Sequence, residues 1–172
     1  MPWAVPESLI VSSKVTFSSG DVVIFGGGGS PAYDVRNWCR QQDGIINFDN
    51  SGVENKKLSN KEYFTWLAGF NAVVAAGSSN PMYDLVTPKY FEIAAAGALL
   101  IGQHCRDLEL LGFNESNCII FTQKDFAEKI RAYKQNPSSY KATREKGREL
   151  IRNRHTISHR IRQIQEVFGC RP

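Results

Sequence analysis

The sequence predicts an α/β fold in which a parallel sheet of about five strands carries helices on both faces. Short runs of β-branched and apolar residues are bounded by glycine, and they alternate with helical segments of about ten to fifteen residues. The runs are apolar at successive positions, which is typical of strands buried on both faces. Right-handed crossovers make such a sheet doubly wound, of the Rossmann-like type.

Composition favours one compact domain and excludes several classes of protein. The chain has 172 residues, of which 42% are hydrophobic and 22% charged, enough for a single core. The four cysteines are far apart and no histidine stands at zinc-ligand spacing, so we expect neither a metal site nor a dense disulfide framework. No apolar run reaches the length of a membrane span, and the N-terminus MPWAVPESL lacks signal-peptide character. We therefore expect a cytoplasmic protein without a transmembrane segment.

Positive charge is concentrated towards the C-terminus. Residues 124–172 hold thirteen Lys or Arg and five Asp or Glu, a net charge of +8, while the whole chain carries +4. A solvated helical face is the commoner meaning of such a run, and an anionic partner is the alternative. Aromatic residues do not interleave with the basic ones, so we expect no nucleic-acid partner.

The order of elements follows from the apolar runs and from helix-capping residues. The expected strands are residues 21–25, 44–48, 70–77, 98–102 and 118–121. Ser59 with Glu62 forms a capping box for one helix, Thr87 and Pro88 begin another that Gly97 ends, and Thr122 caps a third. The expected helices are residues 33–42, 59 onward, 88–97, 122–135, 137–152 and 156–168.

A glycine run, GGGG at residues 26–29, directly follows the first expected strand. Ligands of doubly wound sheets bind beyond the carboxyl ends of the strands, so the run lies at the ligand-binding edge. The bare amides of Gly26, Gly27 and Gly28 allow a phosphate or sugar to approach closely. The alternative is a tight turn that needs positive φ angles.

Neither common phosphate-binding fingerprint fits this loop. The dinucleotide motif would place its third glycine at Pro31, and no Gly-Lys-Ser/Thr follows as a P-loop requires. Arg36, one helical turn further on, adds a positive charge to the edge or is a surface residue.

The helix that begins at Pro88 has two distinct faces. Spacing places Tyr90, Phe91, Ala94 and Ala95 against the sheet and leaves Lys89, Glu92 and Ala96 on another face. The helix dipole disfavours a cation in the first turn, so Lys89 there suggests that an anion shares the site. The alternative is a surface Lys89–Glu92 pair worth about 0.3 kcal/mol.

An ordered set of motifs carries a family resemblance over nearly the whole chain. YDVR at residues 33–36, TPKYFEIAAAGALLI at 87–101, DLELLGF at 107–113 and HTISHR at 155–160 resemble the donor-binding half of GT-B, group 1 glycosyltransferases. The branch that includes spore-coat maturation glycosyltransferase-like proteins is the most similar. The resemblance implies an interdomain connector at 1–20, a Rossmann-like nucleotide-sugar-binding domain at 21–155 and a C-terminal amphipathic helix at 156–172.

The same resemblance implies residue roles. Related retaining enzymes carry two acidic residues eight positions apart, which match Asp84 near the donor sugar and Glu92 on the nucleotide ribose, with aspartate standing where glutamate is usual. Catalytic roles then fall to Asp84 and Lys89. Donor binding falls to Gly26, Gly27, Gly28, Arg36, Thr87 and Glu92. The donor is a nucleoside-diphosphate sugar, and neither a metal nor another cofactor is required.

The acceptor site would belong to an N-terminal half or a partner subunit, since the chain begins where such a half ends. The alternative function is a non-catalytic nucleotide- or sugar-binding interaction module. A response-regulator-like domain is disfavoured because only Asp21 is acidic near the first strand. His155 and His159 are expected to be structural, whereas His104 and Cys105 follow the fourth strand and are candidates to line the donor pocket.

The last helix carries an apolar stripe for which two interpretations remain. Ile157, Ile161, Ile164 and Phe168 fall on one side of it. Core packing is the default expectation. Partial exposure is the alternative, because the resemblance implies a terminal helix that crosses towards the other half.

Overall fold

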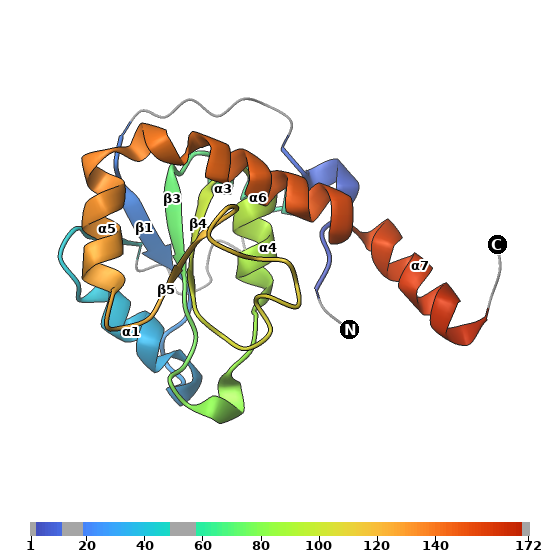
Figure 1. Ribbon diagram of the computed structural model, residues 1–172, viewed down its shortest axis with the longest axis horizontal. Coiled ribbons are helices and arrows are strands. Elements are labelled where there is room, and N and C mark those ends of the chain that lie inside the picture. The colour runs from blue at the N-terminus through green and yellow to red at the C-terminus, as the bar shows by residue number, and fades with distance from the viewer. Residues whose placement is uncertain (1–2, 12–18, 49–57, 170–172) are drawn as a thin grey trace.

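The computed structural model describes residues 3–11, 19–48 and 58–169 and confirms the expected fold class. Five parallel strands form one sheet in the order β2-β1-β3-β4-β5 (Figure 1). Their bounds are Val22–Phe25 for β1, Ile45–Phe48 for β2, Ala72–Ala75 for β3, Leu99–Gln103 for β4 and Ile119–Phe121 for β5. The order reverses between β1 and β3, which makes their carboxyl ends the topological switch point of the sheet.

Helices cover both faces of the sheet (Figure 1). One face packs on α1 (Asp34–Arg40) and α5 (Phe126–Gln135), and the other packs on α3 (Asn60–Ala68), α4 (Pro88–Ala95) and α6 (Lys141–Arg154). Neighbouring residues of β1 face opposite cores: Ile24 joins the α1 and α5 side, while Phe25 joins the α3 and α4 side. Short 3-10 turns occur at Glu7–Leu9, Pro31–Tyr33, Pro81–Tyr83 and Pro137–Tyr140.

Local capping chemistry fixes several boundaries as expected. Ser59 accepts from the amide of Glu62 while the Glu62 carboxylate accepts from the amide of Ser59, so the capping box of α3 is complete. Gly97 follows α4 with a φ of +80°, a conformation that glycine adopts without strain. Both features depend on residues close in sequence, which is why the sequence reveals them.

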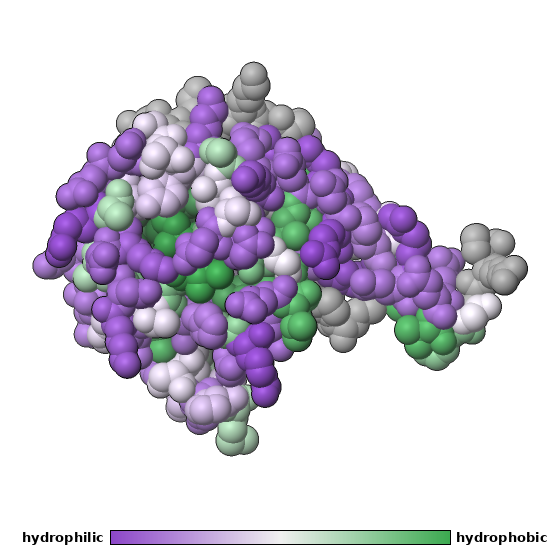
Figure 2. Space-filling model, viewed as in Figure 1, coloured by the Kyte–Doolittle hydropathy of each residue, from purple (hydrophilic) through white to green (hydrophobic). Residues whose placement is uncertain are grey.

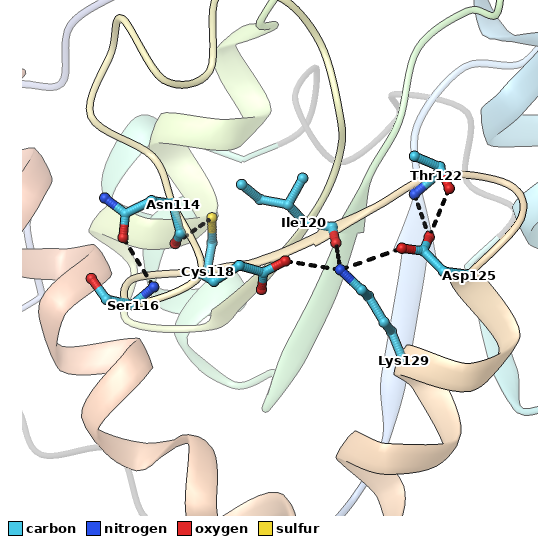
Figure 3. A network of polar contacts seen from close by, with 8 residues as sticks. Asn114, Ser116, Cys118, Ile120, Thr122, Asp125 and Lys129 are labelled. Atoms are coloured by element: carbon cyan, nitrogen blue, oxygen red, sulfur yellow. Dashed lines mark hydrogen bonds and ion pairs between the residues drawn. The ribbon is translucent and has the colours of Figure 1, made fainter.

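The beginning of α5 differs from the expectation that Thr122 caps it. The helix begins four residues later, at Phe126. Asp125 Oδ1 accepts from the amide of Thr122 at 2.6 Å and from its hydroxyl at 2.9 Å (Figure 3). Lys129 bridges this turn to the strand, because its Nζ contacts Asp125 and Glu115 and donates to the carbonyl of Ile120. The turn is therefore held by Asp125, and Thr122 lies before the helix.

The second strand is also less buried than its apolar sequence suggests. β2 lies at the edge of the sheet and pairs only with β1 among the described strands. Ile46 is 43% exposed, so the expectation of burial on both faces is wrong for this strand. An edge strand has a neighbour on one side alone, and fewer helices reach it.

The N-terminal segment pairs with the junction between α6 and α7 (Ile157–Phe168). The amide of Val5 donates to the carbonyl of His155 at 2.9 Å, and the amide of Ile157 donates to the carbonyl of Val5 at 3.2 Å. Arg160 adds a hydrogen bond of 3.0 Å to the carbonyl of Trp3. β1 begins at Val22 and α7 at Ile157, and the domain boundaries expected at 20/21 and 155/156 stay a prediction.

The last helix, α7, projects from the body of the molecule (Figure 1) and carries a hydrophobic face (Figure 2). The default expectation that its stripe packs in the core is wrong. The stripe residues are exposed at 42% for Ile157, 50% for Ile161, 41% for Ile164 and 74% for Phe168. Within the described ranges, every helix is too short or too polar to cross a lipid bilayer.

Candidate functional site

The glycine run forms the loop from β1 to α1 at the carboxyl edge. Gly26 has a φ of +107°, which L side chains rarely adopt. The side chains of α1 lie under the loop and hold its carbonyl oxygens. Arg40 donates to the carbonyl of Gly26, Arg36 to that of Gly27 at 2.9 Å, and Asn37 to that of Gly28 at 2.8 Å.

The opposite side of the same loop is open. A Cβ built on Gly27 or Gly29 would meet nothing within 4 Å. Among the described residues, no hydrogen bond uses the amide of Gly27, Gly28 or Gly29 as a donor. Both interpretations of the run therefore apply, to different glycines. Gly26 makes the positive-φ turn, and Gly27 and Gly29 border open space, whereas Asn37 and Arg40 fill the place of a side chain at Gly28.

Arg36 is a buried residue that ties two loops together. Its side chain is 5% exposed, and its Nε donates to the carbonyl of Ala76 at 3.0 Å in addition to the bond to Gly27. The guanidinium carbon lies 4.1 Å from the centroid of the Tyr33 ring. Burial lowers the pKa of Arg36. The alternative interpretation of Arg36 as a surface residue is therefore wrong. Its expected role in donor binding stays a prediction.

The connection after β3 is pinned to α1 and β4. Asp34 accepts from the amide of Ser79 at 3.0 Å, and hydrogen bonds from Ser78 and then Ser79 lower its pKa to about 2. Gln103 at the end of β4 accepts from the amide of Gly77 and donates to the carbonyl of Ser78, each at 2.8 Å. The two loops at the switch point are thus fixed relative to one another.

Among the described residues, the start of α4 leaves one buried hydroxyl without a hydrogen-bond partner. Thr87 occupies the N-cap position as expected, but its hydroxyl makes no capping hydrogen bond. In the part of the chain that the structure describes, this hydroxyl is buried and has no partner. The amide of Tyr90 donates to the carbonyl of Thr87 at 3.1 Å. Thr87 therefore places an unsatisfied polar atom at the helix N-terminus.

Two of the predicted residues, Lys89 and Glu92, are linked by a third that the sequence did not indicate. The Lys89 ammonium donates to the Tyr63 hydroxyl at 3.5 Å, and that hydroxyl donates to Oε2 of Glu92 at 2.9 Å. Lys89 Nζ also lies 3.7 Å from the centroid of the Phe25 ring. A Cβ on Gly26 would stand 3.1 Å from Lys89 Cε. The structure thus gathers the end of β1, α3 and α4 at one place.

Asp84 lies apart from this cluster. It follows the 3-10 turn after β3, and its Oδ2 accepts from the amide of Arg106 at 3.4 Å. Within the part of the chain that the structure describes, no hydrogen bond joins it to Lys89, Tyr63 or Glu92.

A pocket opens beside Glu92. Its volume is about 380 Å3, within the range of small-molecule sites, roughly 300–1,000 Å3. Tyr63 and Glu92 supply polar groups to a mostly apolar wall. The lining residues are Trp3, Ala4, Val5, Pro6, Leu9, Leu58, Asn60, Tyr63, Phe64, Glu92 and Ile157. It is therefore formed between the N-terminal segment, α3, α4 and the first residue of α7.

Within the described ranges, no group of three or more His, Cys, Asp or Glu side chains is placed to hold a metal ion. His104 is exposed, while Cys105 is buried, and burial followed by the charge of Asp84 raises its pKa to about 11. His155 is buried between Phe91 and Phe113, and its Nε2 contacts the carbonyl of Leu111 at 2.7 Å. These contacts support the structural role expected for His155.

Residues 12–166 match a protein family described as glycosyl transferase-like. The chain belongs to this glycosyl transferase-like family. A match over most of the chain confirms the resemblance to group 1, GT-B glycosyltransferases that the motifs indicated. No curated protein matches the sequence.

Two solved structures share the fold of this glycosyl transferase-like domain. The crystal structure of TarM superposes with a TM-score of 0.59 at 12% identity, covering 93% of this chain and 37% of that one. The GtfA/B complex gives a TM-score of 0.54 at 11% identity, covering 88% and 36%. The chain therefore spans about a third of the length of these proteins. At such low identity the likeness shows the fold, and the roles of individual residues stay predictions.

Proposed function

We propose that this domain binds a nucleoside-diphosphate sugar at the carboxyl edge of its sheet, without a metal, for transfer of the sugar to an acceptor. One observation carries the proposal. In a glycosyl transferase-like domain, Tyr63 links Lys89 to Glu92 beside an open glycine loop at the switch point. A cation for phosphates and a carboxylate for hydroxyl groups thus stand side by side.

The diphosphate would lie between the glycine loop and the start of α4. Gly27 borders open space there, and the first turn of α4 offers its dipole and the unsatisfied hydroxyl of Thr87. Lys89 supplies positive charge at the same point, next to Gly26. Fixed donors of this kind stabilise the negative charge that grows on a leaving diphosphate, so Lys89 would act in catalysis as well as in binding. Arg36 supports the loop from below.

The nucleoside would occupy the pocket beside Glu92. A carboxylate accepts two hydrogen bonds from the hydroxyl groups of a ribose. Glu92 is partly exposed to this pocket, which has apolar walls suited to a base. Asp84, on the connection before α4, would stand near the donor sugar.

Transfer also requires an acceptor site, which we assign to an N-terminal half or a partner subunit. The domain alone should then bind donor and turn over little of it. A module that binds nucleotide without any transferase chemistry is the alternative, and detection of sugar transfer by this domain together with an acceptor-binding half or partner subunit would rule it out.

The proposal is tested by amide NMR titration of this chain with UDP, GDP and ADP in the presence of a chelator. We expect saturable shifts at Gly27, Gly28 and Lys89 with at least one nucleotide. Glu92→Gln keeps an acceptor for Tyr63 but removes the charge, and it should weaken binding about tenfold. Glu128→Gln, on the exposed side of α5, is the matched control and should bind as the native chain does. Saturation by none of the three nucleotides at millimolar concentration would contradict the proposal.

A further inference from the structure

We infer that Tyr63 is a positioning residue that orients Glu92 for the ribose diol. The inference rests on the proposed function and adds to it a residue on α3, outside the loops that frame the site. Its basis is the pair of hydrogen bonds at one hydroxyl group.

The direction of these hydrogen bonds is fixed by chemistry. A tyrosine hydroxyl has a single proton to donate, while the Lys89 ammonium can only donate and the Glu92 carboxylate accepts. The proton of Tyr63 must therefore point to Glu92 Oε2, 2.9 Å away, while its oxygen accepts from Lys89 at 3.5 Å. One carboxylate oxygen is thus held by Tyr63, and in the proposed complex the other would accept from a hydroxyl of the ligand.

The ring of Tyr63 is held rigidly, so its hydroxyl has a defined place. Tyr63 is 6% exposed. Its ring stacks on Trp66 with centroids 6.0 Å apart and meets the edge of Phe64 at 5.8 Å. Trp66 in turn packs against Phe25, whose face carries the Lys89 ammonium. One aromatic cluster therefore supports both Lys89 and the hydroxyl that reaches Glu92.

This arrangement gives Tyr63 a role that depends on the ligand. Lys89 and Glu92 lie three residues apart on α4, and in the proposed complex they would face the phosphates and the ribose respectively. Without the hydroxyl, the Glu92 side chain would sample several rotamers. Binding of the diol would then have to immobilise it, and the lost conformational entropy would lower the affinity. The effect should therefore vanish for a ligand that has no diol.

The test measures binding of UDP, GDP and ADP, and of their 2′,3′-dideoxy analogues, to the native chain and to Tyr63→Phe. Phenylalanine keeps the ring that packs on Trp66 and removes only the hydroxyl. We expect about tenfold weaker binding of the nucleotide that the native chain accepts, because the lost bond joins a charged group. Binding of the dideoxy analogue should be equal in the two proteins. Tyr140→Phe, which removes a hydroxyl on the other side of the sheet, is the control and should change neither.

A double-mutant cycle separates positioning from general damage. In a Glu92→Ala background, Tyr63→Phe should have no further effect on affinity. An equal loss for the diol and dideoxy ligands, or an undiminished loss in that background, would overturn the inference while leaving the proposed function standing. Unchanged nucleotide affinity in Tyr63→Phe would also overturn the inference and leave the proposed function standing. If the native chain binds none of the nucleotides, the proposed function fails, and the role of Tyr63 fails with it.

Discussion

Lys89 places its ammonium 3.7 Å from the centroid of the Phe25 ring, so the last residue of β1 supports a cation in the first turn of α4. A cation at this end of a helix opposes the helix dipole by a few tenths of a kcal/mol. The face of an aromatic ring offsets that cost by about 0.5–1 kcal/mol. The charge is thus held where an anion would meet it.

Replacing Lys89 with methionine should weaken nucleotide binding without unfolding the domain. Methionine keeps an apolar stem on Phe25 and removes the charge that faces the phosphates. We expect about tenfold lower affinity for the nucleoside diphosphate that binds, and unchanged affinity for the corresponding nucleoside, measured by calorimetry or NMR. Lys146→Met, on the exposed side of α6, is the control. Equal losses for the nucleoside and its diphosphate would show that Lys89 does not face phosphate.

Single alanine substitutions in the glycine run should have different effects at Gly26 and at Gly27. Gly26→Ala places a Cβ at a φ of +107° and within 3.1 Å of Lys89 Cε, so it should lower the free energy of unfolding by about 1–3 kcal/mol. Gly27→Ala meets open space and should change that free energy by less than about 0.5 kcal/mol. Its methyl group would instead obstruct a bound phosphate. Denaturant unfolding and nucleotide titration of both variants check the two effects, and a destabilised Gly27→Ala protein would contradict the assignment.

Arg36→Lys should destabilise the domain although the charge is kept. The guanidinium donates from Nε to Ala76 and from a terminal nitrogen to Gly27, a fork that one ammonium cannot reproduce. We expect a loss of about 2 kcal/mol in the free energy of unfolding. Urea denaturation measures it, with Arg131→Lys on the exposed surface of α5 as the control. Similar stability in both variants would mean that the two loops do not depend on Arg36.

The sequence predicts those features that short-range chemistry decides. The capping box of Ser59 and Glu62, the end of α4 at Gly97 and the alternation of strands and helices all depend on residues a few positions apart. Even between neighbouring residues, competition among hydrogen-bonding side chains limits the prediction of where a helix begins. Thr122 was expected to cap α5, but Asp125 accepts both of its hydrogen bonds, and the helix begins after them.

Tertiary packing decides the features that the sequence did not reveal. Tyr63 meets Glu92 across 29 positions only because α3 and α4 lie side by side on the same face of the sheet. No pattern within α3 distinguishes Tyr63 from an ordinary core aromatic residue. The stripe of α7 shows the same limit, since its periodicity indicated an apolar face but not whether that face, with Ile161 at 50% exposure, would be covered.

His155 should make the domain lose stability as the pH falls below neutrality. Its Nε2–H donates to the carbonyl of Leu111 at 2.7 Å, and its Nδ1 accepts from Arg160 at 2.5 Å, so the ring is neutral in this geometry. Burial, followed by the nearby charges of Arg160, Arg154 and His159, lowers the pKa of His155 to about 4 despite the opposing bond to Leu111.

The sign follows from proton binding. The unfolded chain, in which His155 has its ordinary pKa of 6.5, takes up the proton first as the pH falls. The contribution of neutral His155 is therefore complete above that value and is lost as the pH falls towards 4. Between about pH 7 and about pH 5 this one group should cost about 2 kcal/mol of the free energy of unfolding.

Urea denaturation at the two pH values measures this loss. His155→Gln should be less stable than the native chain near pH 7, because the amide only partly replaces both hydrogen bonds, but its stability should depend less on pH. His104→Gln, at an exposed position, is the control and should keep the native pH dependence. Other titrating groups are common to all three proteins and cancel in the comparison. Parallel pH dependences for the native chain and His155→Gln would show that His155 is not the group that titrates.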